Sequence, residues 1–115
     1  MTQQIVETDH AIIPRPDATP ASLRAAIARV RPSSLREFDQ QLLEASTEAQ
    51  AAQNVGPLRV FCASWAMYVE IQRFPLRAQR LAALEHMVDT GHPDTRSAVR
   101  EIAELLREAS EDLGQ

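Results

Sequence analysis

The chain of 115 residues has the length of a single domain, and its hydrophobic fraction of 44% is ordinary for a globular protein. Good helix formers dominate and only three residues are glycine, which indicates an all-α protein. The net charge is −4, from 16 acidic side chains against 12 basic ones that are all arginine, so broad, sequence-independent binding of nucleic acid is disfavoured.

The sequence carries no signal for export or membrane insertion. Residues 1–7 lack the basic and apolar regions of a signal peptide. The most apolar uncharged run, residues 60–69, is about half as long as a helix that spans a bilayer. Cys62 is the single cysteine, which excludes a disulfide within the chain and suits a reducing compartment. We therefore expect a cytoplasmic protein that makes no membrane contact.

Residues 1–18 show neither helical nor strand periodicity and contain Pro14 and Pro16. Two interpretations remain open for this segment. It is either a disordered tail or an arm that packs on a neighbour or partner through Ile12 and Ile13. The domain itself is expected over residues 19–115.

The first predicted helix has clear start and stop signals. Thr19 is a suitable N-cap before Pro20, whose missing N–H costs nothing in the first turn. Pro32 ends the helix, because it excludes Arg31 from the α region. Four apolar residues at helical spacing form its inner stripe: Leu23, Ala26, Ile27 and Val30.

The second predicted helix begins with a capping box, in which Ser34 and Glu37 each satisfy a free N–H at the helix start. We expect Gly56 to take the left-handed conformation that ends this helix, and Pro57 to start the next one. The inner stripe narrows from large residues to alanines: Leu35, Phe38, Leu42, Ala45, Ala49 and Ala52.

The third predicted helix, residues 57–73, is the most apolar segment of the chain. No charge occurs between Arg59 and Glu70, and apolar side chains cover almost every direction around the axis. A helix that is apolar all round is buried on most sides. We therefore predict a compact bundle of four to five helices around this central helix.

Two more helices are expected after Pro75, one to about Val88 and one to about Leu113, separated by a turn at residues 90–93. The last two inner stripes repeat the spacing of three and four: Ala78, Leu81, Leu84 and Val88, then Val99, Ile102, Leu106, Ala109 and Leu113.

No pattern of catalytic or metal-binding residues stands out. His86, Asp89, His92 and Asp94 are metal-ligand types, but we favour roles in the turn and at the helix start, because their spacing is irregular for a zinc site. Cys62 lies in the most apolar helix, where a thiol is normally inert. We therefore predict a non-enzymatic protein without a cofactor.

Two groups of residues are candidates for binding a partner. Phe61, Trp65 and Tyr68 form either core or a partly exposed aromatic patch, and we expect Phe61 and Trp65 to be buried. Three arginines form the local basic cluster: Arg73, Arg77 and Arg80. This cluster either binds phosphate or carboxylate groups, or forms a solvated face that pairs with Glu70 and Glu85.

The caps and the tryptophan helix together resemble a family of small actinobacterial proteins of unknown function. The resemblance covers about residues 19–85 and rests on these patterns: Thr19-Pro20-x-x-Leu23-Arg24-x-x-Ile27, Leu35-x-Glu37-Phe38-Asp39, Pro57-Leu58-x-x-Phe61-x-x-x-Trp65 and Glu70-Ile71-x-Arg73-x-Pro75. It implies the fold and transfers no active-site residue. It also implies an antitoxin-like role beside a small ribonuclease-like toxin.

From these observations we predict a protein-binding module whose acidic charge suits a basic partner, such as a toxin. The alternative is a DNA-associated transcriptional regulator that uses the arginine cluster. A homodimer is also compatible with the sequence, because the apolar stripes exceed what one small core uses.

Overall fold

The computed structural model of the protein describes residues 9–114 and contains five α-helices and one short 3-10 helix, with no strand in that range. The prediction of an all-α fold of four to five helices is confirmed. The helices have these bounds: α1 Pro20–Val30, η1 Pro32–Ser34, α2 Leu35–Ala52, α3 Gly56–Gln72, α4 Pro75–Asp89 and α5 Thr95–Asp112.

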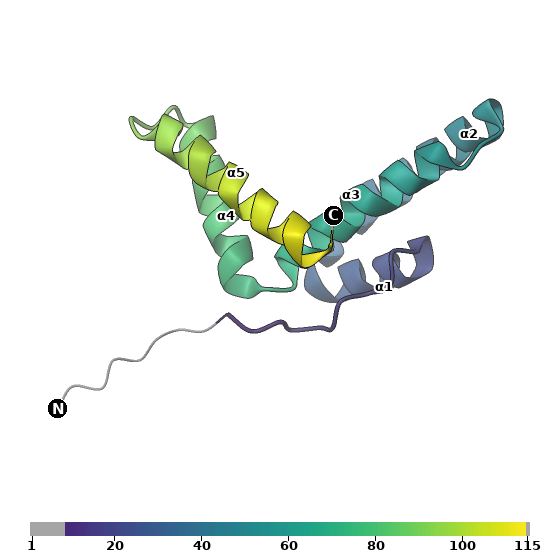
Figure 1. The fold of residues 1–115 in the computed structure, drawn as a ribbon, viewed down its shortest axis with the longest axis horizontal. Coiled ribbons are helices and arrows are strands. Elements are labelled where there is room, and N and C mark those ends of the chain that lie inside the picture. Colours follow the sequence, from purple (N-terminus) through teal and green to yellow (C-terminus); the bar gives the residue numbers. More distant parts are fainter. Residues whose placement is uncertain (1–8, 115) are drawn as a thin grey trace.

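The helices form two antiparallel hairpins that diverge from a common corner, as Figure 1 shows. One arm consists of α2 and α3, and the other of α4 and α5, while α1 lies along the first arm near the corner. The corner is the short link at Phe74, where the backbone is extended and Pro75 begins α4. None of the helices that the structure describes is long and apolar enough to cross a membrane.

Helix α3 is the central element, as predicted, because it contacts α1, α2, α4 and α5. Its second half is buried from Trp65 to Ile71 apart from Met67 and Tyr68, which are half-buried. Its first half is covered on one side only, since Val60 is 68% exposed and Ala63 and Ser64 also face water. The expected burial on most sides therefore holds for the second half of the helix.

An aromatic cluster joins α2 to α3 at the centre of the first arm. The ring of Phe38, which is fully buried, lies 5.0 Å from that of Phe61 and 5.2 Å from that of Trp65, between ring centroids. Rings at these distances in tilted or edge-on contact stabilise a core beyond the area they bury. The expected burial of Phe61 and Trp65 is confirmed, with 6% of each exposed.

The start of α1 follows the prediction, and the start of α2 does not. Thr19 Oγ1 accepts a hydrogen bond from the backbone N–H of Ser22 at 3.3 Å. The prediction of a capping box at Ser34 is wrong, because this residue makes no side-chain cap. Its hydroxyl instead forms a hydrogen bond of 2.7 Å with the Tyr68 hydroxyl. The 3-10 turn of η1 leads into α2 and places Ser34 opposite α3, so a tertiary contact replaces the local one.

The link between α2 and α3 also differs from the prediction. Gln53, and not Gly56, takes the left-handed conformation, with φ at 53°. Gly56 is the first residue of α3, and its N–H donates to Asn54 Oδ1 at 2.8 Å. The asparagine side chain thus supplies the turn that brings the chain directly into the next helix.

The inner face of α5 is rotated from the predicted stripe. Ala98 and Ala109 are buried against the rest of the arm, while Val99 is 50% exposed and Leu106 is 40% exposed. The apolar surface of α5 is wider than its contact with α4 and α3 covers, so one edge of the stripe faces water. The prediction that Val99 and Leu106 point inward was wrong for this reason.

The described part of the N-terminal segment packs on its own domain. Ile13 is buried, while Ile12 stays exposed and donates its N–H to the carbonyl of Arg73 at 2.8 Å. The described residues from Asp9 onward thus pack on the chain's own domain, with only Ile13 of the two isoleucines buried. Contact with a neighbour or partner through Ile12 and Ile13 stays a prediction. Residues 1–8 lie outside the described part, so the tail prediction is not tested there.

Candidate functional site

A groove runs along the first arm between α2 and α3. It consists of two adjoining hollows of about 220 and about 230 Å³, which share Gln41 and Ser64. We name it the α2–α3 groove, and these residues line it: Glu37, Gln41, Glu44, Ala45, Glu48, Pro57, Val60, Phe61, Ser64, Trp65 and Tyr68.

The aromatic side of the α2–α3 groove is held in place by hydrogen bonds. The Trp65 indole N–H donates to Gln41 Oε1 at 3.0 Å, which ties α3 to α2 across the groove. The Tyr68 ring packs edge-on against Trp65, and its hydroxyl is bonded to Ser34. Such a wall is preorganised, because its polar atoms already have partners and its rings cannot rotate freely.

A row of carboxylates forms the α2 rim of the groove. Glu37, Glu44 and Glu48 lie on one face of α2, at spacings of seven and four. None of the three has an ion pair with an arginine in residues 9–114; Glu37 accepts from the amide of Gln41 instead. The opposite rim, on α3, carries the exposed apolar side chain of Val60. One rim is therefore negative and the other is apolar.

The residues that the sequence analysis proposed for partner binding lie in two separate places. Phe61, Trp65 and Tyr68 all line the α2–α3 groove, although only Tyr68 is more than slightly exposed. The three arginines lie at the α3–α4 corner and on α4, and none of them lines the groove. The two groups do not form one surface.

Each arginine of the cluster is paired with a carboxylate. Arg73 is buried and bound to Glu70, as one interpretation of the sequence predicted, but it is not part of a solvated face. The other two pairs join α4 to α5: Arg77 with Asp112 at 3.2 Å and Arg80 with Glu101 at 2.6 Å. The expected partner Glu85 is not used. The cluster thus joins helices, and its charge is largely neutralised.

Glu70 is the buried carboxylate of the structure, with 1% of the residue exposed. Arg15 donates to its two oxygens at 2.8 Å each, and Arg73 donates to them at 3.1 and 2.8 Å. Burial alone would raise the pKa of Glu70, but the hydrogen bonds and charges of the two arginines outweigh it and lower the pKa to about 2. Sequence analysis missed this triad, although a lone glutamate in the most apolar helix is a signal for a buried partner.

The N-terminal strap, which we define as residues 9–15, contacts both sides of the α3–α4 corner. Arg15 binds α3 through Glu70, and Arg73 Nη1 donates to the carbonyl of Ile13 at 3.2 Å. The Asp9 carboxylate caps the start of α4 by accepting from the N–H groups of residues 76 and 77 at 3.1 and 2.9 Å. The strap therefore joins the end of α3 to the start of α4 at the corner from which the two arms diverge.

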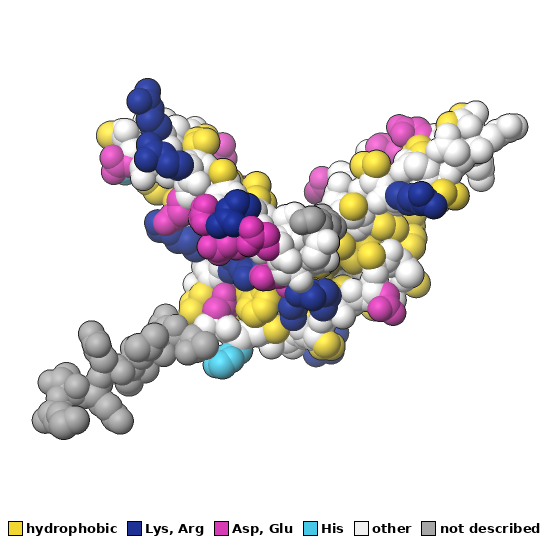
Figure 2. Space-filling model, in the orientation of Figure 1, with side chains coloured by type: hydrophobic (Ala, Val, Ile, Leu, Met, Phe, Trp, Pro, Cys, Tyr) yellow, Lys and Arg dark blue, Asp and Glu magenta, His cyan; other side chains and the backbone are white. Residues whose placement is uncertain are grey.

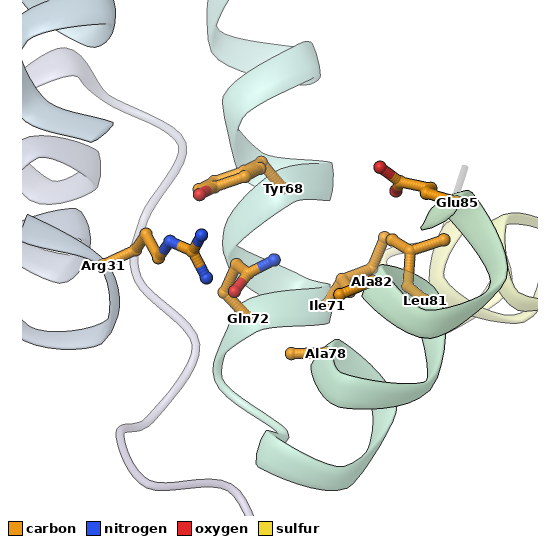
Figure 3. Close-up of a pocket in the computed structure, with 8 residues that line it drawn as sticks. All are labelled: Arg31, Tyr68, Ile71, Gln72, Ala78, Leu81, Ala82 and Glu85. Atoms are coloured by element: carbon orange, nitrogen blue, oxygen red, sulfur yellow. The ribbon is translucent and has the colours of Figure 1, made fainter. Parts of the chain in front are cut away.

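A separate hollow of about 210 Å³ lies between α3 and α4, close to the end of α1 (Figure 3). Ile71, Ala78 and Leu81 form its apolar part, while Arg31 and Glu85 lie on different sides of it. The charged groups are on exposed side chains, and the Tyr68 hydroxyl that reaches the hollow is already bonded to Ser34. This hollow shows no paired acid and base suited to catalysis.

Residues 13–110 match the model of a family of unknown function, DUF6247. The chain belongs to DUF6247. The match extends beyond the resemblance noted at residues 19–85 and includes most of α5 as well as Ile13 and Arg15 of the strap. No curated protein and no solved structure matches the chain. The actinobacterial origin and the antitoxin-like role stay predictions.

The remaining candidates for chemistry in this DUF6247 protein have local roles. His92 Nδ1 accepts from the N–H of Asp94 at 3.0 Å within the turn before α5, at the place that the sequence assigned to a turn. Across residues 9–114, no three metal-ligating side chains gather in one place. Burial raises the pKa of the Cys62 thiol, which lowers its reactivity.

Proposed function

We propose that the protein is a non-enzymatic binding module whose α2–α3 groove accepts an amphipathic helix with a basic edge. The observation that carries this proposal is the row of Glu37, Glu44 and Glu48 beside an aromatic wall. These carboxylates lack an arginine partner among the described residues, whereas six other acidic side chains have one or more. A partner with arginine or lysine along one edge would supply the missing charges.

The shape of the groove supports a helix as the ligand. The outermost rim carboxylates, Glu37 and Glu48, lie eleven residues apart on α2, a length of about 17 Å, or three helical turns. Helices that lie in such grooves use apolar residues at spacings of three and four as anchors. Val60 and the edges of the aromatic side chains offer the apolar contact that such anchors need.

The net charge of −4 favours the same class of partner, because opposite potentials accelerate association. An antitoxin-like role, with a basic toxin as the ligand, is the specific form that the resemblance implies. The alternative role at DNA has weaker support, because Arg73, Arg77 and Arg80 are each bound to a carboxylate.

A synthetic helical peptide of leucine and lysine tests the proposal directly. Its binding to the full chain is measured by fluorescence anisotropy of a label on the peptide, next to a peptide with glutamate in place of lysine. The lysine peptide should bind, and the triple variant E37Q/E44Q/E48Q should weaken binding about tenfold. The matched control E85Q/D89N/E108Q removes three negative charges from the other arm and should leave affinity within about twofold. Equal loss in both variants, or equal binding of both peptides, would contradict a role for the groove.

The Trp65 side chain provides an internal reporter for the same experiment. It is the single tryptophan of the chain and lies in the groove wall. A helix seated in the groove should shift the fluorescence emission of this residue, because its ring edge and its hydrogen bond to Gln41 lie in the groove wall, while a peptide bound elsewhere by charge alone should not.

A further inference from the structure

We propose that the helix that fits the α2–α3 groove is α5 of a second copy of this chain, docked antiparallel to α2. This inference rests on the proposed function, because it names the occupant of the same groove. It follows from the surface of α5, from the spacing of its charges and from the geometry of the two arms.

The exposed edge of α5 is apolar. Val99, Ala103 and Leu106 face water at spacings of four and three, which places them on one side of the helix. This edge is the part of the apolar stripe that α4 leaves uncovered. It has the pattern of anchors expected of a helix that lies in a groove.

A row of arginines runs beside this apolar edge. Arg96, Arg100 and Arg107 share one side of α5, and Figure 2 shows basic side chains along this arm. Arg96 and Arg100 have no ion pair within the described chain. Arg107 is bound to Glu104 and Glu111 of its own helix. The chain itself therefore contains an amphipathic helix with a basic edge.

The charges of the two helices match in spacing when the helices run in opposite directions. Along α5 the arginines are separated by four and then seven residues; along α2, read backwards from Glu48, the glutamates are separated by four and then seven. Because all α-helices have the same rise per residue, the three charges of each row can lie opposite one another over about 17 Å. Arg96 then faces Glu48 and Arg100 faces Glu44.

The groove of the same chain is not the binding site for its own α5. The two arms diverge from the α3–α4 corner (Figure 1), and α5 contacts α3 and α4 but not α2. The strap holds this corner through Asp9 and Arg15. A second copy can instead place its α5 in the groove and offer its own groove in return. Such an exchange is the self-complementary contact of a two-fold dimer.

Charge reversal on each side of the proposed contact tests it. Sedimentation of the full chain should show a dimer, and E44R/E48R and R96E/R100E should each weaken dimerisation at least about a hundredfold. Mixing the two variants should restore a dimer, since both contacts of the mixed pair then join opposite charges. The chain with all four substitutions should also form a dimer. The control E85R/E108R should remain dimeric, and circular dichroism should show the same helix content in every variant.

Three results would overturn the inference: a wild-type chain that sediments as a monomer, reversed variants that still form dimers, or a mixture of variants that stays monomeric. The lysine-peptide experiment separates this failure from that of the proposed function. If the chain is a monomer and still binds the peptide, and if E37Q/E44Q/E48Q weakens that binding, the groove remains a binding site. The second copy is then excluded as its occupant. A groove that binds neither the peptide nor a second copy would refute both.

Discussion

Arg15 and Glu70, which lie 55 positions apart in the sequence, meet through two hydrogen bonds of 2.8 Å each between the guanidinium and the carboxylate. This contact ties the N-terminal strap to the central helix, on the α3 side of the corner from which the arms diverge. Arg73 completes the arrangement from the same helix. A buried carboxylate that accepts from two guanidinium groups is satisfied in both charge and hydrogen bonding, so it stabilises the position of both segments.

Acid should destabilise the protein partly through Glu70. Its pKa is about 2 in the folded chain against an ordinary value of 4.5, so its contribution is complete above about pH 4.5 and is lost as the pH falls toward 2. Glu70→Gln should lower the free energy of unfolding at pH 7 by about 3 kcal/mol, because Arg73 then stays buried without its carboxylate. Urea unfolding at several pH values should show the two proteins converge near pH 2, and a difference that does not change with pH would contradict this role.

The strap should detach when its link to α3 is removed. Arg15→Gln removes two hydrogen bonds to Glu70 while leaving those from Arg73. Hydrogen exchange should become at least about tenfold faster at the Ile12 amide, which donates to the Arg73 carbonyl, because local opening then costs less. Arg36→Gln is a suitable control, since Arg36 is exposed, makes no ion pair in the described residues and lies on α2, away from the strap. Unchanged exchange at Ile12 would show that the contacts of the strap through Arg73, Asp9 and the buried Ile13 suffice without Arg15.

The contributions of Ser34 and Tyr68 to the free energy of unfolding should be coupled. Removing either hydroxyl, by Ser34→Ala or Tyr68→Phe, should lower the free energy of unfolding by about 1 kcal/mol, because the pair at 2.7 Å is partly buried. The double variant should cost little more than either single one, so that the coupling energy is about 1 kcal/mol. Additive effects would contradict this coupling, because they would show that the two hydroxyls contribute independently. Ser33→Ala serves as the matched control on the same turn.

Gln53 is the one position where a non-glycine residue takes a positive φ in the described chain. Gln53→Gly should raise the free energy of unfolding by about 0.5 to 1 kcal/mol, because glycine has no Cβ to strain in this conformation. Gln53→Ala keeps the Cβ and should bring no such gain. Thermal unfolding of the three proteins measures the difference, and a destabilised glycine variant would refute the assignment.

Signals that act within a few residues allowed the helices to be predicted. Helix boundaries are determined here by Thr19 before Pro20, by Pro32 and by Pro75. These residues act through backbone geometry and one local hydrogen bond, so their effect does not depend on the tertiary structure. The absence of charge before Glu70 likewise identified the central helix, since a helix that is apolar all round packs against several neighbours.

Tertiary structure alone decided the features on which the proposed function rests. The predicted cap at Ser34 was wrong because its hydroxyl bonds to that of Tyr68 instead. The predicted inner stripe of α5 was wrong because this helix has one main neighbour, which covers only part of its apolar face. The α2–α3 groove and the Arg15–Glu70 contact depend on which surfaces meet across long stretches of chain. The periodicity of the sequence indicates that a helix face is apolar or charged. Which neighbour covers that face depends on the packing of the whole chain.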